Sequence, residues 1–385
     1  MKFRKIRKSY ALIMDEVYHY LAVSYEIRKF KDKRRTEIYS KVKLTKEQMD
    51  QIDQLYVNYY GKKIPYTWHK HFTAFAGNFD PKFIPEHIYI PEFEKYMNQW
   101  GFYADVLQDK NFLTLLANSM DVKMPKLLVY CSRGVFHNNR YKIISVDEVK
   151  TILQNLDKPY FVKPSVDSSS GRGCFILDPG CIDTQNIDSV LEKLGTDFTI
   201  QELLICHESI RNLYPNSVNT FRVITYNWKG HIYHMPSLMR IGCGGNVLDN
   251  AHAGGMFIGI DDSGLLKREA YTEFLHRFTE HPDTKIVFDK YKIQNFGKVL
   301  ETAHRCHEAV SQLGCINWDF TIDSYGNPVL IEANCKSGSV WLTEEANGCG
   351  PFGERTEEIL SWLRFMNTLS PDERKKYPFG FGDYS

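Results

Sequence analysis

A turn between two strand-like segments is the feature that most constrains the fold of this chain. Residues 315–334 read CINWDFTIDSYGNPVLIEAN, and the central YGNP is typical of a turn. Apolar and polar residues alternate on both sides of it, which predicts a β-hairpin. The turn centre falls near residues 325 and 326. Asp319 and Glu332 lie at nearly equal distances from this centre, so we expect them to face each other across the two strands.

The acidic residues of this hairpin indicate a metal site. Asn334 follows Glu332 by two residues, so its side chain is expected on the same face of the strand. Two carboxylates this close repel each other unless a cation neutralises them, and hard oxygen ligands favour Mg2+, with Mn2+ as an alternative. We predict a metal held by Asp319, Glu332 and Asn334 and completed by water and nucleotide phosphates. The alternative is an edge hairpin with solvated acidic side chains.

The length and composition predict a globular protein of two or three domains. The chain has 385 residues, 43% of them hydrophobic and 14% aromatic. No apolar segment approaches the ~18 residues of a membrane span, and the first ten residues lack a signal-peptide pattern. The nine cysteines are scattered and form no C-x-x-C pair, which argues against disulfides and a zinc site. We therefore expect a cytoplasmic protein.

Positive charge is concentrated in residues 1–43, which hold 13 Lys/Arg and 5 Asp/Glu. Apolar residues such as Ile13, Val17 and Leu21 between these charges predict a helix. One interpretation is that the helix lies on an anionic membrane surface, at the inner face of the membrane, or on an assembly complex. The other, which the charge pattern favours, is a helix with an ordinary solvated face. No aromatic pattern suited to stacking bases is present, so no nucleic acid partner is expected.

A second informative segment is FVKPSVDSSSGRGCFIL, residues 161–177. A predicted strand ends near Lys163, and a Ser/Gly loop over 168–173 leads into another strand. Backbone N–H groups and hydroxyls in such a loop can surround phosphates, and Lys163 adds a positive charge. The segment matches neither a P-loop nor a dinucleotide-binding turn, because the lysine precedes the glycines. The alternative is a polar hairpin loop.

Together, these segments resemble the ATP-grasp enzymes over roughly residues 95–365. The signature consists of Lys110 in DKNF, Lys163 in VKPS, the predicted strand IQELL (200–204), and WDF…IEAN. The resemblance implies that the two lysines and the loop hold ATP phosphates, that QELL meets adenine, that Glu208 accepts the ribose hydroxyls, and that the acidic hairpin binds two Mg2+ ions. The implied nucleotide-binding residues are Lys110, Lys163, Ser169, Ser170, Gly171, Gly173, Gln201, Glu202, Leu203, Leu204 and Glu208.

Three further segments resemble one branch of these enzymes, the sugar-transfer-associated ATP-grasp proteins, which are linked to exopolysaccharide and capsule genes. They are NSVNTFRVIT, LMRIGCGGNVLDNAHAGG and DKNFLTLLANSMDVKMPK. Arg222 and Arg240 lie in strand-like segments and can donate forked hydrogen bonds to a γ-phosphate or a carboxylate, although surface ion pairing is the alternative. The pair Gly254 and Gly255 allows backbone N–H groups to approach an oxyanion. The candidate catalytic residues are Arg222, Arg240, Asn250 and Gly255.

The resemblance implies an α+β protein with the ATP-grasp fold. A helical, basic region (1–95) would precede a small subdomain (96–198) with Lys110 and the Ser/Gly loop. A large subdomain (199–365) would carry the metal site, and a tail (366–385) would follow. The two mixed subdomains would clasp ATP, with a hinge near residues 198–205.

Such enzymes activate a carboxylate as an acyl phosphate and then join it to an amine. Phosphoryl transfer depends on charge neutralisation, which the lysines, arginines and metal ligands can provide. We predict an ATP- and Mg2+-dependent ligase that joins a small carboxylate or sugar-derived substrate to an amine acceptor in polysaccharide or cell-surface glycan biosynthesis. A kinase acting on a sugar-type substrate needs the same residues and remains an alternative. A nucleotide-binding accessory protein is a third, against which the complete set of residues argues.

Overall fold

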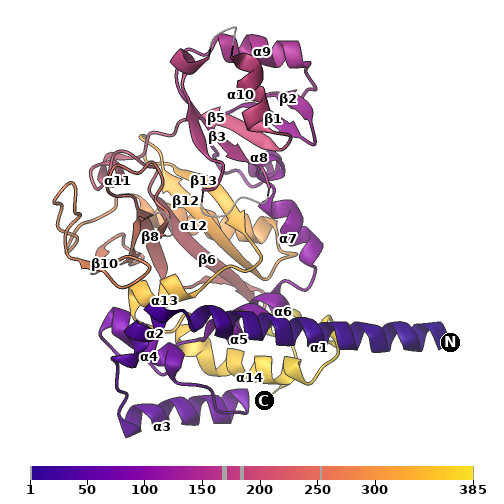
Figure 1. Ribbon diagram of the computed structural model, residues 1–385. Helices are drawn as coiled ribbons and strands as arrows, with labels where there is room; N and C mark the ends of the chain where they lie inside the picture. The colour runs from indigo at the N-terminus through magenta and orange to yellow at the C-terminus, as the bar shows by residue number, and fades with distance from the viewer. Residues whose placement is uncertain (1, 167–170, 183–185, 252–253, 385) are drawn as a thin grey trace.

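The computed structural model describes residues 2–166, 171–182, 186–251 and 254–384. The molecule has three parts, which are arranged one after another (Figure 1). A small sheet with two helices lies at one end, a large sheet lies in the middle, and a helical layer lies at the other end. This arrangement confirms the predicted α+β class and the helical N-terminal region. Among the described residues, no helix combines the length and the apolar character that crossing a bilayer requires.

The small sheet is antiparallel, with the strand order β2-β1-β5-β3-β4. Apolar side chains of α9 and α10 pack on one of its faces, where Val149 and Ile187 meet Val129 and Ile200. Helix α9 begins at Val146 because Ser145 and Glu148 form a capping box. The elements are α8 (Lys110–Ser119), β1 (Leu127–Ser132), β2 (Val135–Asn138), α9 (Val146–Gln154), β3 (Tyr160–Pro164), β4 (Phe175–Leu177), α10 (Ile187–Leu194) and β5 (Phe198–Glu202).

The large sheet has the order β11-β10-β9-β8-β6-β12-β13, and β7 pairs with β6 beside this path. Helix α12 (Phe296–Ala309) packs on one face, where its Phe296 meets Phe221 of β6 in the main hydrophobic core. The strands are β6 (Thr220–Trp228), β7 (His231–His234), β8 (Ser237–Ile241), β9 (Met256–Ile260), β10 (Leu266–Tyr271), β11 (Arg277–Phe278), β12 (Cys315–Ile322) and β13 (Pro328–Asn334).

The predicted hairpin is present as β12 and β13, and it contains a β-bulge. Phe320 pairs with Leu330, but the next pair is Asp319 with Glu332, so Ile331 is an extra residue in β13. In a regular ladder Asp319 would face Ile331, and Glu332 would point to the α12 side of the sheet. The bulge therefore brings both carboxylates to the same face. The turn itself is closed by Gly326, whose φ of +81° suits glycine.

The helical layer combines both ends of the chain. Residues of α3 and the following helical turns, such as Ile52 and Tyr56, share a hydrophobic cluster with Trp362 and Leu363 of α14. The predicted boundary at residue 365 thus falls within α14. The layer contains α1 (Lys2–Phe30), α2 (Lys33–Ser40), α3 (Lys46–Leu55), α4 (Thr67–Ala76), α5 (Glu86–Ile88), α6 (Lys95–Met97), α13 (Trp341–Asn347), α14 (Thr356–Asn367) and α15 (Pro371–Arg374), and α7 (Gly101–Gln108) links it to the small sheet.

Candidate active site

A row of charged side chains crosses the large sheet on the face opposite α12. Arg222 of β6 pairs in register with Asp319 of β12, which pairs with Glu332 of β13. Arg240 of β8 lies beside this row, since it pairs with Thr220, two residues before Arg222. Antiparallel pairing gives paired residues a common face, so segments up to 110 residues apart in sequence build one charged surface.

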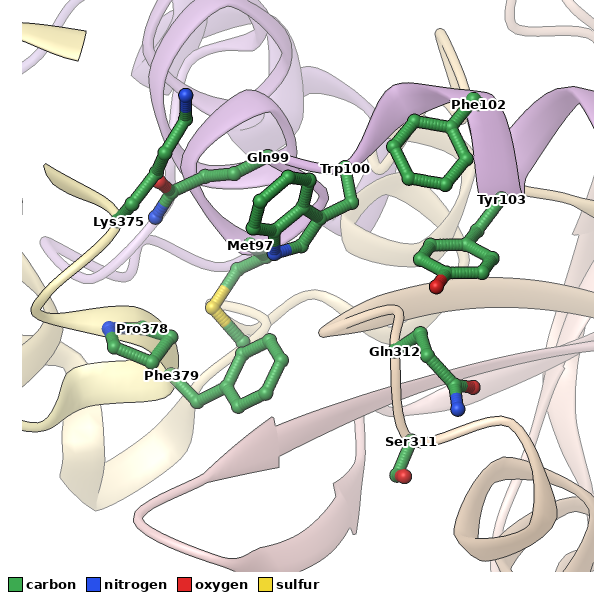
Figure 2. Close-up of a pocket in the computed structure, with 10 residues that line it drawn as sticks. All are labelled: Met97, Gln99, Trp100, Phe102, Tyr103, Ser311, Gln312, Lys375, Pro378 and Phe379. Carbon is green, nitrogen blue, oxygen red and sulfur yellow. The ribbon is translucent and has the colours of Figure 1, made fainter. Parts of the chain in front are cut away.

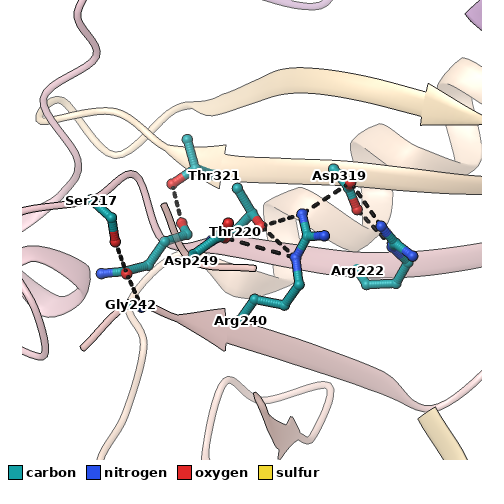
Figure 3. Close-up of polar contacts among 9 residues, drawn as sticks. Ser217, Thr220, Arg222, Arg240, Gly242, Asp249, Asp319 and Thr321 are labelled. Carbon is teal, nitrogen blue, oxygen red and sulfur yellow. Dashed lines mark hydrogen bonds and ion pairs between the residues drawn. The ribbon is translucent and has the colours of Figure 1, made fainter. Parts of the chain in front are cut away.

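Asp319 is held by both arginines (Figure 3). Arg222 donates from Nε to Oδ1 at 2.7 Å and from Nη2 to Oδ2 at 2.9 Å, and Arg240 donates from Nη2 to Oδ2 at 3.0 Å. The residue is 1% exposed. Burial alone would raise the pKa of Asp319, but the two guanidinium charges outweigh it and hold this pKa below its ordinary value.

This arrangement joins two predictions that the sequence analysis kept apart. The sequence predicts that Asp319 binds a metal and that the two arginines bind a phosphate or a carboxylate. In the structure, these three residues form one hydrogen-bonded cluster. Arg222 and Arg240 do form ion pairs, as the alternative interpretation expected, but with the buried carboxylate of Asp319 rather than at the surface. A carboxylate in such a place requires its partners, because an unpaired buried charge is costly.

Asp249 extends the cluster, and the sequence analysis missed it. Thr220 donates its backbone N–H to Asp249 Oδ2 at 2.9 Å, and Thr220 Oγ1 accepts from Arg240 Nη2 at 2.7 Å. Arg240 Nε is 3.7 Å from Asp249 Oδ2. Burial is the main cause that raises the pKa of Asp249. The available signal was its position directly before Asn250 in DNAHAGG.

Gly255 shapes the segment that carries Asp249. Its N–H donates to the Asn250 carbonyl at 3.0 Å, and a Cβ on Gly255 would lie 2.5 Å from the Asp249 carbonyl oxygen. Only glycine fits this close approach. The proposed oxyanion contact of Gly255 and the catalytic role of Asn250 remain predictions.

Two lysines reach the same place from the small sheet. Lys110, the first residue of α8, has its Nζ 3.0 Å from Glu332 Oε1. Lys163 of β3 donates from Nζ to the carbonyl of Ile331, the bulge residue, at 3.3 Å. Burial, and then the charge of Lys110, lower the pKa of Lys163 to about 8, against the opposing effect of Glu332. Residues of the small-sheet part of the molecule thus contact the acidic hairpin of the large sheet.

The Ser/Gly loop is described from Gly171 onward, and Ser169 and Ser170 lie outside the described residues. Gly171 and Gly173 have φ values of +73° and +76°. A Cβ on Gly171 would lie 2.6 Å from Leu248 Cδ1, in the segment between β8 and β9. The loop of the small sheet therefore packs closely against a connection of the large sheet.

The predicted adenine-binding strand ends earlier than expected. Strand β5 covers Phe198–Glu202, so Leu203 and Leu204 lie beyond it, and the exposed Leu203 shows that the chain leaves the sheet here. Glu202 pairs with Lys158 at 2.9 Å, and Gln201 is buried. Glu208 begins the short helix α11 (Glu208–Arg211). The assignment of Gln201, Glu202, Leu203, Leu204 and Glu208 to adenosine remains a prediction.

The oxygen ligands present fit a metal that is shared with a nucleotide. Asn334 pairs with Asn317 in the ladder, two residues from the Asp319 pair, and so shares its face. Within the described part of the chain, no group of three or more His, Cys, Asp or Glu residues could hold a metal ion. Two carboxylates and an amide are too few for a complete protein-only site, but they suit Mg2+, which retains water and phosphate ligands. The metal role of Asp319, Glu332 and Asn334 remains a prediction.

The segments that carry these residues match a known family. Residues 91–359 match the model of the sugar-transfer-associated ATP-grasp proteins. The chain belongs to this ATP-grasp family. The match includes both lysines, both arginines and the acidic hairpin, and it confirms the ATP-grasp fold implied by the sequence resemblance.

The solved structures that resemble this chain are distant from it. D-alanine–D-alanine ligase from Bacillus anthracis is 13% identical, with a TM-score of 0.38, over 70% of this chain and 69% of that one. L-amino acid ligase from Bacillus licheniformis is 12% identical, with a TM-score of 0.37, over 62% and 42%. Carboxyaminoimidazole ribonucleotide synthase from Aspergillus clavatus, complexed with ATP, is 12% identical, with a TM-score of 0.36, over 60% and 45%. This chain spans less than half the length of the last two. No curated protein matches it.

A separate pocket of about 300 Å3 lies beside α7 (Figure 2). Its walls include Trp100, Phe102 and Tyr103, together with Phe379 and Lys375. It shares no lining residue with the charged row, so the chemistry discussed below does not involve it.

Proposed function

We propose that this ATP-grasp protein is a ligase that activates a carboxylate with ATP and joins it to an amine. One observation carries the proposal: four cationic side chains converge on the acidic hairpin. Lys110 and Lys163 reach it from the small-sheet part of the molecule. Arg222 and Arg240 reach it from the neighbouring strands of the large sheet. Four cationic side chains face three carboxylates, Asp319, Glu332 and Asp249, so the cations outnumber the acids by one, which suits a polyphosphate.

The chain's own groups would first bind and orient ATP. Lys110 would exchange Glu332 for a phosphate oxygen, and Lys163 would do the same with the Ile331 carbonyl. The loop at Gly171 and Gly173 would cover the phosphates, and the chain at Gln201–Leu204 and Glu208 would hold the adenosine. Glu332, released from Lys110, and Asn334 would hold Mg2+ together with Asp319, which would exchange an arginine contact for the metal. When bound, the metal would neutralise phosphate charge.

The reaction would proceed in two steps, phosphoryl transfer and then amide formation. A substrate carboxylate oxygen attacks the γ-phosphorus, and the bond to the β-phosphate oxygen breaks, which releases ADP and leaves an acyl phosphate. The amine nitrogen then attacks the acyl carbon, loses a proton, and inorganic phosphate leaves. Arg222 and Arg240 would neutralise the oxygens of the transferring phosphoryl group. Closure of the two sheets would exclude water, which otherwise hydrolyses the acyl phosphate.

The biological substrate class rests on the family description. Its association with sugar transfer supports a role in polysaccharide or cell-surface glycan biosynthesis, with a small carboxylate or sugar-derived acid and an amine as substrates. We place this reaction in the cytoplasm, where ATP is available.

The test is ADP release from Mg-ATP by purified protein, with pools of uronic acids, amino sugars and amino acids. The control is the single variant Glu332→Gln, which leaves the buried pairs of Asp319 with Arg222 and Arg240 in place. ADP release that needs both a carboxylate and an amine, and that the variant lacks, would support the ligase. Release with one hydroxyl or carboxylate substrate alone would identify a kinase instead. Tight ATP binding without turnover in any pool would identify an accessory protein.

A further inference from the structure

Helix α1 is attached to the molecule by its polar side. Asp15 receives hydrogen bonds from Lys95 Nζ and Arg374 Nη1, each at 2.6 Å. Burial opposes ionisation of Asp15, but these two bonds hold its pKa below the ordinary value. Further along the helix, Glu26 is buried. Asp15 and Glu26 therefore face the protein, on the side where a helix normally places apolar residues, whereas Glu16 and Arg28 are exposed.

The apolar side chains of α1 face outward instead. Ile13, Val17, Leu21 and Tyr25 are four residues apart, so they form one ridge along the helix. They are 58%, 45%, 59% and 63% exposed. The neighbouring Met14, Tyr18 and Tyr20 are also exposed. The first turns of the helix extend beyond the rest of the molecule (Figure 1). We call Ile13, Val17, Leu21 and Tyr25 the outer ridge.

Positive charge flanks the outer ridge on both sides. Residues 2–8 contain five Lys/Arg and no acidic residue. Beyond the other end, Arg28, Lys31, Lys33 and Arg34 are exposed. A second copy of α1 laid against the ridge, parallel or antiparallel, would bring a basic end against another basic end. Like charges this close are unfavourable, so the charge pattern argues against a partner of the same sequence.

We propose that the outer ridge lies in the interface of a membrane rich in anionic lipids. Apolar and tyrosine side chains would enter the boundary between headgroups and acyl chains, and the flanking lysines and arginines would meet the lipid phosphates. The proposal takes up the membrane interpretation of the sequence rather than the ordinary solvated face, because the exposed side of α1 carries the outer ridge. The inference does not depend on the proposed reaction. It adds a docking surface that would hold the enzyme beside membrane-bound substrates or products.

The test uses the full chain and cosedimentation with two vesicle types. One contains phosphatidylcholine alone, and the other contains equal parts of phosphatidylcholine and phosphatidylglycerol. We expect binding to the anionic vesicles that is at least about tenfold stronger than to the neutral ones, and that weakens at high salt. No ATP or substrate is added, so the result is independent of enzymatic activity.

Two variants test the ridge. Val17→Ser, Leu21→Ser removes apolar surface without adding charge, and Val17→Glu, Leu21→Glu adds repulsion. Each should lose at least about tenfold in affinity for anionic vesicles. Ile143→Glu, Val287→Glu is the matched control, since both residues are exposed and lie outside α1, in connections between other elements. It should bind like the unaltered protein, and equal thermal unfolding of all variants checks their folding.

Three results would overturn the proposal. The first is equal or absent binding to both vesicle types. The second is unchanged binding of the serine variant. The third is a concentration-dependent dimer, measured by light scattering, that the serine variant lacks, which would show that a second copy covers the ridge.

Discussion

Lys110 and Glu332 form an ion pair of 3.0 Å between the first turn of α8 and the bulged strand β13. The pair joins the small-sheet side of the molecule to the acidic hairpin. Neither charge is free for a ligand while the pair persists. In the proposed mechanism, nucleotide binding separates the pair, and Lys110 gains a phosphate while Glu332 gains a metal ion.

Lys110→Ala should lower kcat/KM for ATP by about 100-fold, because a phosphate-binding cation in a buried site is lost. The measurement is ADP release at varied ATP concentration. Lys123→Ala is the control, since its exposed amine pairs with Asp323 of the hairpin. An unchanged kcat/KM for Lys110→Ala would exclude the phosphate contact.

Asp319→Asn should destabilise the protein by about 3–5 kcal/mol, because Arg222 and Arg240 lose their shared buried counter-charge. Urea unfolding measures the free energy. Glu332→Gln is the comparison, and its more accessible side chain should cost under about 1 kcal/mol. Equal stability of Asp319→Asn and the unaltered protein would contradict this account of the cluster.

The same carboxylate predicts acid sensitivity. The pKa of Asp319 is lowered in the folded state, so its stabilisation is present above the unfolded pKa and is lost as pH falls through the folded pKa. The unaltered protein should lose stability more steeply than Asp319→Asn when the pH decreases below about 4. Unfolding curves at a series of acidic pH values provide the check, and identical slopes would refute it.

Lys163 predicts proton uptake on ATP binding. With a pKa of about 8 in the free protein, Lys163 is about half neutral near pH 8, whereas a bound phosphate favours the charged form. Calorimetry in two buffers with different ionisation enthalpies should show uptake of part of a proton. Lys163→Arg should abolish the uptake, because arginine remains charged. A binding enthalpy that is the same in both buffers would rule this out.

Gly255→Ala should destabilise the protein by about 1–3 kcal/mol and reduce ADP release, because the new methyl group would displace the Asp249 carbonyl. Gly297→Ala in α12 is the control. Its Cβ would meet no atom within 4 Å, and alanine should stabilise this helix by about 0.5–1 kcal/mol. Denaturant midpoints measure both, and a neutral Gly255→Ala would show that the segment adjusts freely.

The sequence predicted what local patterns determine. The YGNP turn and the flanking alternation gave the hairpin, and the resemblance located both lysines. The sequence analysis did not reveal the contacts of Arg222 and Arg240 with Asp319, since β6, β8 and β12 meet only through sheet pairing. Asp249 was missed for the same reason. The sequence also could not show which side of α1 faces the protein, because that depends on the contacts of Asp15 with the distant Lys95 and Arg374.

The extra residue in β13 has a consequence for the interpretation of related sequences. Loss of Ile331 would turn the bulge into a regular ladder, in which the residue after Leu330 still faces Asp319. The acidic pair would survive, and only the carbonyl that Lys163 contacts would disappear. A one-residue gap at this point of an alignment is therefore compatible with an intact pair of Asp319 and the glutamate. A one-residue gap between Phe320 and Ile322 has a different effect, because it would move the Asp319 side chain to the other face of the sheet.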